Sequence, residues 1–314
     1  MGLLVNGKWQ DRWYDTDSSD GKFERESAQF RHQIGDKDFP VEADRYHLYV
    51  SLACPWAHRT LIFRKLKKLE SLISVSVVSP IMLEQGWSFE QNEGSSGDPL
   101  YGMTHLHELY TRDTADYTGR VTVPVLWDKK QQRIVNNESA DIIRQFNTAF
   151  DGLTGDTQNF YPAALHSDIE SINEQVYHGV NNGVYRCGFA TTQAAYDEAY
   201  QQLFATLDAL EARLSGQAFL AGEQVTEADW RLFTTLIRFD AVYHGHFKCN
   251  RQRLEDFPSL SNYLRQLYQW PGIAETVDFS HIKRHYYISH TMINPTQVVP
   301  DGPAIDYNRP HNRR

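Results

Sequence analysis

The 314-residue chain has few cysteines, no long apolar run and no long basic run. Its three cysteines lie far apart, which excludes the dense disulfide framework of small secreted proteins. Because no stretch of about 18 apolar residues occurs, we expect no membrane-spanning helix. Because no long Lys/Arg run occurs and the net charge is −9, we expect no nucleic-acid partner.

Signals for export, nucleotides and metals are also missing. The first residues lack the basic region and apolar core of a signal peptide, so we expect a cytoplasmic, reduced protein. No Gly-rich phosphate loop is present, which argues against nucleotide binding. His244, His246 and Cys249 are zinc-ligand types, but no fourth ligand follows nearby. We therefore expect no metal and no permanently bound cofactor.

The overall composition is that of a globular protein. Hydrophobic residues make up 41% of the chain and charged residues 23%. A chain of this length is long for a single core, so two domains are expected.

One motif combines a cysteine with a strand end and a helix start. The apolar run Tyr46–Val50 predicts a strand, and apolar residues at helical spacing after Thr60 predict a helix. Cys54 precedes Pro55, a residue suited to a first helical turn. Free N–H groups and the positive end of the helix dipole favour a thiolate there. The sequence therefore predicts that Cys54 is a nucleophile; the alternative is a buried structural cysteine.

The residue three positions after Cys54 limits its redox chemistry. A dithiol oxidoreductase has a second cysteine at that position, whereas this chain has Ala57. A disulfide formed at Cys54 must therefore be resolved by an external thiol. The abundant cytosolic choice is glutathione.

The first half of the chain reads as an α/β domain. Further strands are expected at 73–78, 120–128 and 133–136, and helices near 104–111 and 140–146. Pro124 interrupts its strand signal, which requires an edge, a bulge or a cis bond. The Asn137–Ser139 segment precedes the helix at 140–146, whose free N–H groups form a carboxylate site.

The second half reads as all-helical. Apolar stripes at 165–176 and 196–210 predict two helices, and Thr226 with Asp229 predicts a capping box at the start of another. The expected division is an extended N-terminal arm (1–40) anchored by Trp9, Trp13 and Tyr14, an α/β domain (41–155), a helical domain (156–288) and an extended tail (289–314).

The order of these elements resembles glutathione transferases, which join a thioredoxin-like domain to a helical bundle. Val123-Pro124 resembles the cis-proline that pairs with the cysteinyl part of glutathione, and Glu138-Ser139 resembles the γ-glutamyl site. Segments 51–59, 84–87, 119–127, 137–142, 181–186, 239–248 and 285–295 further resemble the Xi class, the glutathionyl-hydroquinone reductases.

This resemblance implies an activity and a set of site residues. Cys54 would take glutathione from a glutathionyl-hydroquinone, and a second glutathione, the cosubstrate, would regenerate the thiol. Tyr185 would donate or accept the proton, while Tyr243 and Tyr286 would support the thiolate. The implied glutathione-binding residues are Trp87, Arg120, Val121, Thr122, Val123, Glu138 and Ser139. The resemblance also implies a homodimer.

Two other functions stay open from the sequence. One is a thiol transferase of the Omega kind, acting on dehydroascorbate or protein mixed disulfides. The other is a noncatalytic binding module on the same fold. Trp87 and the tyrosines favour the hydroquinone reductase over the first alternative. The Cys54-Pro55 pair argues against the second, because a binding module needs no thiolate.

Overall fold

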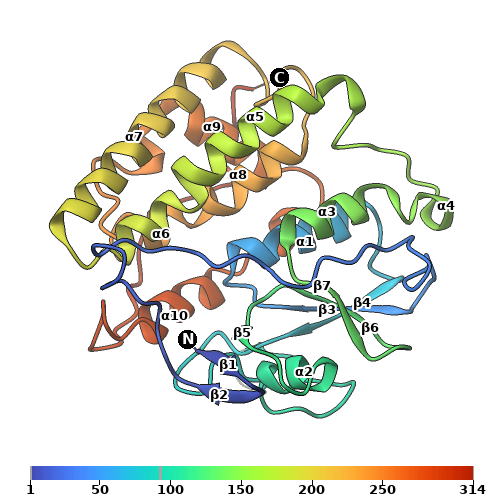
Figure 1. Cartoon of the computed structure of the whole chain (residues 1–314). Helices are drawn as coiled ribbons and strands as arrows, with labels where there is room; N and C mark the ends of the chain where they lie inside the picture. Colours follow the sequence, from blue (N-terminus) through green and yellow to red (C-terminus); the bar gives the residue numbers. More distant parts are fainter. Residues whose placement is uncertain (1, 92–93, 314) are drawn as a thin grey trace. The chain divides into compact units, whose positions relative to one another are not determined.

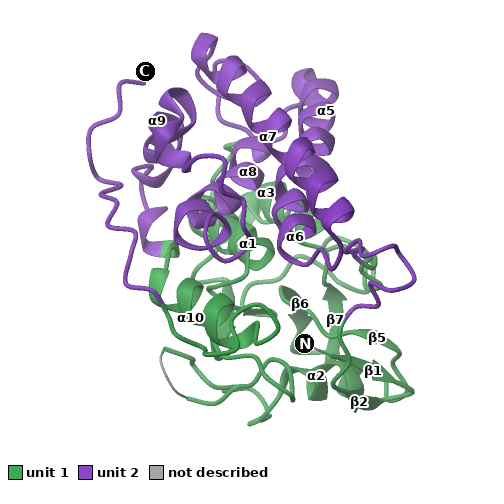
Figure 2. Ribbon diagram, turned by 90° about the vertical axis from the view of Figure 1, so that its left-hand side faces the viewer, with its two compact units in different colours: residues 1–13, 26–158, 276–299 green, residues 14–25, 159–275, 300–314 purple. Residues whose placement is uncertain are grey.

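The computed structural model describes residues 2–91 and 94–313, and the chain divides into two compact units (Figures 1 and 2). Unit 1 consists of Met1–Trp13, Glu26–Gln158 and Thr276–Val299. Unit 2 consists of Tyr14–Arg25, Asn159–Glu275 and Pro300–Arg314. The domain limits expected from the sequence (1–40, 41–155, 156–288 and 289–314) differ from the limits of these two units, and they stay a prediction.

Unit 1 is built on a mixed four-stranded sheet with the order β4-β3-β6-β7. The buried strand β3 (Tyr46–Val50) pairs in parallel with β4 (Ile73–Val77) and antiparallel with β6 (Val125–Asp128). A hairpin joins β6 to β7 (Arg133–Asn136). The predicted strands at 46–50, 73–78 and 133–136 are confirmed, whereas only Val125–Asp128 of the strand predicted at 120–128 belongs to this sheet, directly after Pro124.

Helices cover both faces of this sheet. Helices α1 (Pro55–Leu66) and α3 (Ser139–Thr148) pack on each other. Figure 1 shows them on one side of the sheet and α2 (Leu106–Asp113) on the other. The short α4 (Asp151–Thr154) and the late helix α10 (Phe279–Ser289) complete the helices of the described part of this unit. The predicted α/β fold is therefore confirmed.

The expectation of an extended arm over residues 1–40 is wrong at its start. Strands β1 (Leu3–Val5) and β2 (Lys8–Gln10) form a hairpin, and β1 also pairs with β5 (Gly119–Arg120). The turn residues Asn6 and Gly7 have φ of 48° and 71°. An Asn-Gly pair is the typical sequence for this two-residue turn, so the signal was present in the chain.

Unit 2 is helical, as predicted. It contains α5 (His166–Val176), α6 (Gly183–Gly188), α7 (Gln193–Gly216), α8 (Glu227–Arg238) and α9 (Pro258–Tyr268). Helix α5 packs on α8, and α7 packs on both α6 and α9. Of the stripe predicted over 165–176, Ile169, Ile172 and Val176 are buried on α5, whereas Leu165 lies in the short 3₁₀ turn before the helix and is only half-buried.

Two π-helical turns interrupt the regular geometry of unit 2. One spans Tyr177–Asn181, between α5 and α6, and the other spans Phe239–Tyr243, directly after α8. Such turns are rare and occur often at functional sites. They lie in the two segments that carry Tyr185 and Tyr243.

Among residues 2–91 and 94–313, no helix has both the length and the apolar character needed to cross a bilayer. Residues 300–313 belong to unit 2 and form no helix or strand. The Arg313 guanidinium donates to the carbonyl oxygens of Leu214, Gln217 and Ala218 at 2.6–3.0 Å. These bonds hold the tail in place.

Candidate active site

Cys54 caps the N-terminus of α1. Strand β3 ends at Val50, and Cys54 takes an extended conformation (φ −75°, ψ 121°) directly before Pro55. Its side chain makes no capping hydrogen bond and is partly exposed. The sulfur lies 3.7 Å from the carbonyl oxygen of Val123. The thiol is therefore held between the free N–H groups of a helix and the segment that precedes Pro124.

The Val123–Pro124 peptide bond is cis, as the resemblance predicted. The backbone before it is fixed by Tyr110 of α2, which the sequence did not single out. The Tyr110 hydroxyl donates to the Thr122 carbonyl oxygen at 2.8 Å and accepts from the Thr122 N–H at 3.2 Å. Burial raises the pKa of Tyr110, so the ring stays a neutral phenol that can do both.

Glu138 and Ser139 form the start of α3. Glu138 is the N-cap, and its Oε1 accepts from the Ala140 N–H at 3.0 Å. The Ser139 hydroxyl lies 3.4 Å from the guanidinium of Arg59, a residue of α1. Helices α1 and α3 pack together, so this bond links the element that bears Cys54 with the predicted γ-glutamyl site.

Arg120 has its guanidinium directed toward the N-terminal arm. It donates to the carbonyl oxygens of Arg12 and Trp13 at 2.6 and 3.1 Å. It also forms an ion pair with Glu26 at 3.2 Å. These three partners flank residues 14–25, so Arg120 joins the two ends of that segment. The Arg120 side chain thus stabilises the conformation of the N-terminal arm. Its contact with glutathione stays a prediction.

Trp87 and Tyr286 both lie in unit 1, where helix α10 carries Tyr286 and packs on the loop that carries Trp87. The Trp87 ring stacks on His285 with centroids 4.8 Å apart. The His285 Nδ1 lies 3.0 Å from the Pro80 carbonyl oxygen, which fixes the loop that leads to Trp87. Tyr286 follows His285 and is buried, with its ring edge against His290.

Tyr185 and Tyr243 lie together in unit 2. Tyr185 is on α6 and Tyr243 ends the second π-helical turn, with ring centroids 6.1 Å apart. Phe247 contacts both rings, at 5.6 and 5.4 Å. The sequence singled out both tyrosines but missed Phe23, whose ring lies 6.2 Å from that of Tyr185. No local pattern marks Phe23, because its partners are far along the chain.

The other two thiols lack the features of Cys54. Cys187 is 2% exposed and Cys249 is fully buried. Burial and the neighbouring Cys187 raise the pKa of the Cys249 thiol well above its usual range. Such a thiol stays protonated and is a poor nucleophile.

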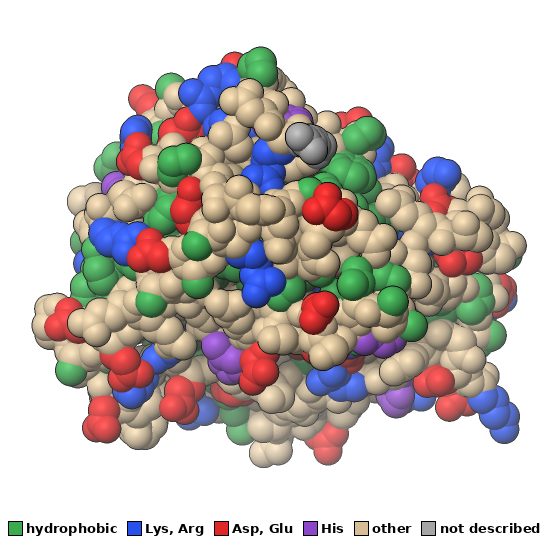
Figure 3. Space-filling view, turned by 90° about the horizontal axis from the view of Figure 1, so that it is seen from above, with side chains coloured by type: hydrophobic (Ala, Val, Ile, Leu, Met, Phe, Trp, Pro, Cys, Tyr) green, Lys and Arg blue, Asp and Glu red, His purple; other side chains and the backbone are tan. Residues whose placement is uncertain are grey.

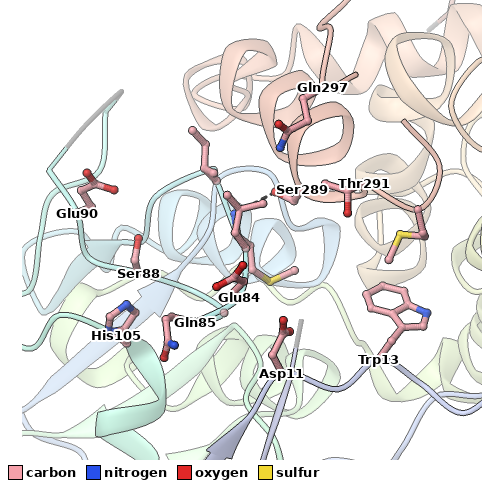
Figure 4. A pocket seen from close by; sticks show the side chains of 15 residues that line it. Asp11, Trp13, Glu84, Gln85, Ser88, Glu90, His105, Ser289, Thr291 and Gln297 are labelled. Atoms are coloured by element: carbon pink, nitrogen blue, oxygen red, sulfur yellow. Dashed lines mark hydrogen bonds between the residues drawn. The ribbon is translucent and has the colours of Figure 1, made fainter. Parts of the chain in front are cut away.

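A groove of about 750 Å³ lies beside the loop that carries Trp87 (Figure 4). Asp11, Glu84, Ser88 and His105 line it together with Ser289 of α10. None of the predicted site residues is on its walls. In the described part of the chain, no three His, Cys, Asp or Glu side chains are placed to hold a metal ion.

Both halves of the chain match known protein families. Residues 53–149 match the family Glutathione S-transferase, N-terminal domain, and residues 193–266 match Glutathione S-transferase, C-terminal domain. These matches agree with the α/β and helical parts seen in the structure.

Individual proteins are similar over the full length. The chain is 54% identical to Glutathionyl-hydroquinone reductase YqjG of Escherichia coli (strain K12), covering 100% of this chain and 98% of that protein. It is 52% identical to Glutathionyl-hydroquinone reductase PcpF of Sphingobium chlorophenolicum, covering 97% of each.

Solved structures agree in fold. The glutathione-bound structure of YqjG from E. coli K-12 is 51% identical, with a TM-score of 0.91 over 99% of this chain and 98% of that chain. A Xi class GST from Natrialba magadii is 48% identical, with a TM-score of 0.93 over 100% of this chain and 96% of that chain. The chain therefore belongs to the glutathione transferase family, in its Xi class of glutathionyl-hydroquinone reductases.

Proposed function

We propose that this protein removes glutathione from glutathionyl-hydroquinones through a mixed disulfide on Cys54, releasing hydroquinone and oxidised glutathione. The observation that carries the proposal is the partly exposed Cys54 thiol at the N-terminus of α1, with alanine at the resolving position. This substrate class is supported by the names of YqjG and PcpF, the two glutathionyl-hydroquinone reductases that are 54% and 52% identical to this chain.

The reaction has two exchange steps. In the first, the Cys54 thiolate attacks the glutathione sulfur, an S–S bond forms and the bond from sulfur to the aromatic carbon breaks. The electron pair goes to that carbon, which takes a proton, so the ring is reduced while two sulfurs are oxidised. In the second step, a second glutathione attacks the glutathionyl sulfur and Cys54 leaves as thiolate.

We assign the chain's residues to these steps as follows. Tyr185 gives the proton to the aromatic carbon and then takes one back from the incoming glutathione. Tyr243 and Tyr286 support the thiolate. Glutathione is held by the α3 N-terminus and the segment before Pro124, with the residues Trp87, Arg120, Val121, Thr122, Val123, Glu138 and Ser139. It acts as a cosubstrate that leaves in each cycle.

Replacing Cys54 tests the proposal. Cys54→Ala should abolish reduction of glutathionyl-hydroquinones while glutathione still binds in a calorimetric titration, because the α3 N-terminus is unchanged. Mass spectrometry of the wild type with substrate should show one glutathione adduct, on Cys54. Activity kept in the variant, or an adduct on Cys187 or Cys249, would show that the nucleophile is assigned wrongly.

A substrate panel separates the related functions. Glutathionyl-hydroquinones, dehydroascorbate and a glutathione mixed disulfide can be assayed with one preparation. We expect the highest kcat/KM for the hydroquinones. A clear preference for dehydroascorbate or the mixed disulfide would instead favour an Omega-like transferase, and no turnover of any of them would favour a binding module.

We further propose that the protein acts as a homodimer in the cytoplasm. The class resemblance suggests the dimer, and the dependence on reduced glutathione suggests the compartment. Unit 1 also carries exposed apolar side chains at Leu83, Met292 and Val298, the first two on the wall of the groove in Figure 4.

A further inference from the structure

Residues 14–25 of the N-terminal arm belong to unit 2, although the residues on either side belong to unit 1. The base of this segment is held by Arg120, which binds the carbonyl oxygens of Arg12 and Trp13 and the carboxylate of Glu26. Residues 14–25 thus form a loop whose two ends are held close together by Arg120. The role of this loop therefore depends on the residues of unit 2 that it contacts.

Several contacts tie the segment to the helices of unit 2. The Gly21 carbonyl oxygen accepts from the Thr191 N–H at 3.0 Å. Lys22 forms an ion pair with Glu198 of α7 at 2.8 Å. The Phe23 ring lies 5.3 Å from Phe189 and 6.2 Å from Tyr185. The segment therefore packs on α6, on Phe189 that follows it and on the first turns of α7.

Arg25 ends this segment and lies over the ring of Tyr185. Its guanidinium carbon is 5.1 Å from the centre of the Tyr185 ring and 5.5 Å from that of Phe23. Its Nε donates to the Asn182 side-chain oxygen at 3.0 Å. Asn182 directly precedes α6, so this bond sets the orientation of the guanidinium relative to the helix that bears Tyr185.

A permanent cation near a phenol affects its two protonation states differently. A guanidinium stays charged at all working pH values. Here it lies 5.1 Å from the centre of the Tyr185 ring and is attracted to the face of that ring. A cation beside an ionisable group favours the ionised form over the neutral one. When Tyr185 gives up its proton, negative charge develops on its oxygen. A charge already in place stabilises that state without rearrangement.

We propose that Arg25 is a positioning residue for the reaction, which holds the Tyr185 ring and stabilises the phenolate formed as Tyr185 protonates the departing hydroquinone carbon. The proton moves from the Tyr185 oxygen to the carbon that has lost sulfur, and the phenolate is reprotonated by the incoming glutathione thiol. This inference rests on the proposed function, and it gives the N-terminal arm a part in the proton transfer.

Two substitutions of Arg25 and one matched control test this inference. Arg25→Met keeps much of the packing area but removes the charge, whereas Arg25→Lys keeps the charge. Lys22→Gln removes one positive charge from the same segment, at a side chain that pairs with an exposed carboxylate. Each variant is assayed with a glutathionyl-hydroquinone and with a small glutathione mixed disulfide.

Arg25→Met should lower kcat for the hydroquinone about tenfold, which corresponds to the lower end of the effect of one neighbouring charge on an ionisation. Its KM and its mixed-disulfide exchange should stay within about twofold, because a thiolate leaves without a proton. Arg25→Lys should recover most of the lost kcat, and Lys22→Gln should match the wild type on both substrates.

Other results would overturn the inference. Equal losses of Arg25→Met on both substrates, no recovery in Arg25→Lys, or an equal loss in Lys22→Gln would mean that the segment acts only through folding. A wild type that does not reduce glutathionyl-hydroquinones would overturn the proposed function itself, and the inference with it. An active wild type with a fully active Arg25→Met would overturn the inference alone.

Discussion

Cys54, Cys187 and Cys249 have the same side chain in three different surroundings. Cys54 is partly exposed at a helix N-terminus, next to the Val123 carbonyl oxygen. Cys187 and Cys249 are buried, and burial raises the pKa of the Cys249 thiol. Because the thiolate is the reactive form, only the surroundings of Cys54 suit a nucleophile.

At the same scale, Tyr185→Phe tests the proposed proton donor. Breaking the bond from sulfur to an aromatic carbon leaves charge on the ring, so a proton must arrive in that step. The variant should slow hydroquinone reduction by about 10²–10⁴, the usual size of acid–base catalysis. Exchange with a small mixed disulfide should change only a few-fold, because a thiolate is a good leaving group.

Both substrates can be assayed with one preparation of the Tyr185→Phe variant. Equal losses on both would mean that Tyr185 positions glutathione or the thiolate, and is not the acid. No loss on either would leave Tyr185 as a packing residue of its aromatic cluster in unit 2, with Phe23, Phe189 and Phe247.

At the scale of elements, helix α8 begins with a capping box whose carboxylate, on Asp229, is buried and binds other parts of unit 2. Thr226 and Asp229 form the predicted capping box, and the Thr226 N–H donates to Asp229 at 2.7 Å. The same carboxylate accepts from the Leu220 N–H at 2.9 Å and from the Tyr263 hydroxyl at 2.8 Å. Burial raises the pKa of Asp229, and these hydrogen bonds oppose that rise.

Thr226→Ala should therefore lower the free energy of unfolding by about 0.5–2 kcal/mol, the usual effect of losing an N-cap side chain. The measurement is urea denaturation followed by circular dichroism. The exposed Thr296→Ala is a matched control and should change the free energy by less than about 0.5 kcal/mol. Unchanged melting of Thr226→Ala together with lost turnover would contradict a purely structural role for the box.

At the scale of the whole molecule, charge is spread in both signs. Lys and Arg side chains are interspersed with Asp and Glu on the face shown in Figure 3, and many form pairs such as Arg251 with Asp208. The net charge of −9 is thus distributed over a mixed surface. In the proposed function, selectivity for an anionic tripeptide therefore depends on the local site, where we propose the α3 N-terminus as the carboxylate site, more than on the overall field.

At this scale, the proposed homodimer can be tested by measuring the molecular mass of the protein in solution. Sedimentation equilibrium at micromolar concentration should give about twice the chain mass of 36.3 kDa. The exposed variant Thr296→Ala serves as a control for preparation, since it should give the same mass as the wild type. A single-chain mass over the full concentration range would contradict the dimer.

Local physics allowed much of the fold to be predicted. Strand β3, Pro55 and α1 follow from an apolar run, a first-turn proline and helical spacing, which act over a few residues. The same is true of the capping box at Thr226. The hairpin at Asn6-Gly7 is also encoded locally by this turn pair, and an extended arm over residues 1–40 does not account for it.

The sequence by itself determined two local features, a cysteine before a proline at a helix start and a glutamate directly before another helix, whereas the resemblance to the Xi class indicated Tyr185, Tyr243 and Tyr286. Only the tertiary structure decided what surrounds them. Arg120 contacts the arm across 108 positions, and Arg25 contacts Asn182 across 157. The reason is physical: such contacts depend on how separate elements pack, and neither hydrophobic periodicity nor capping encodes a partner so far along the chain.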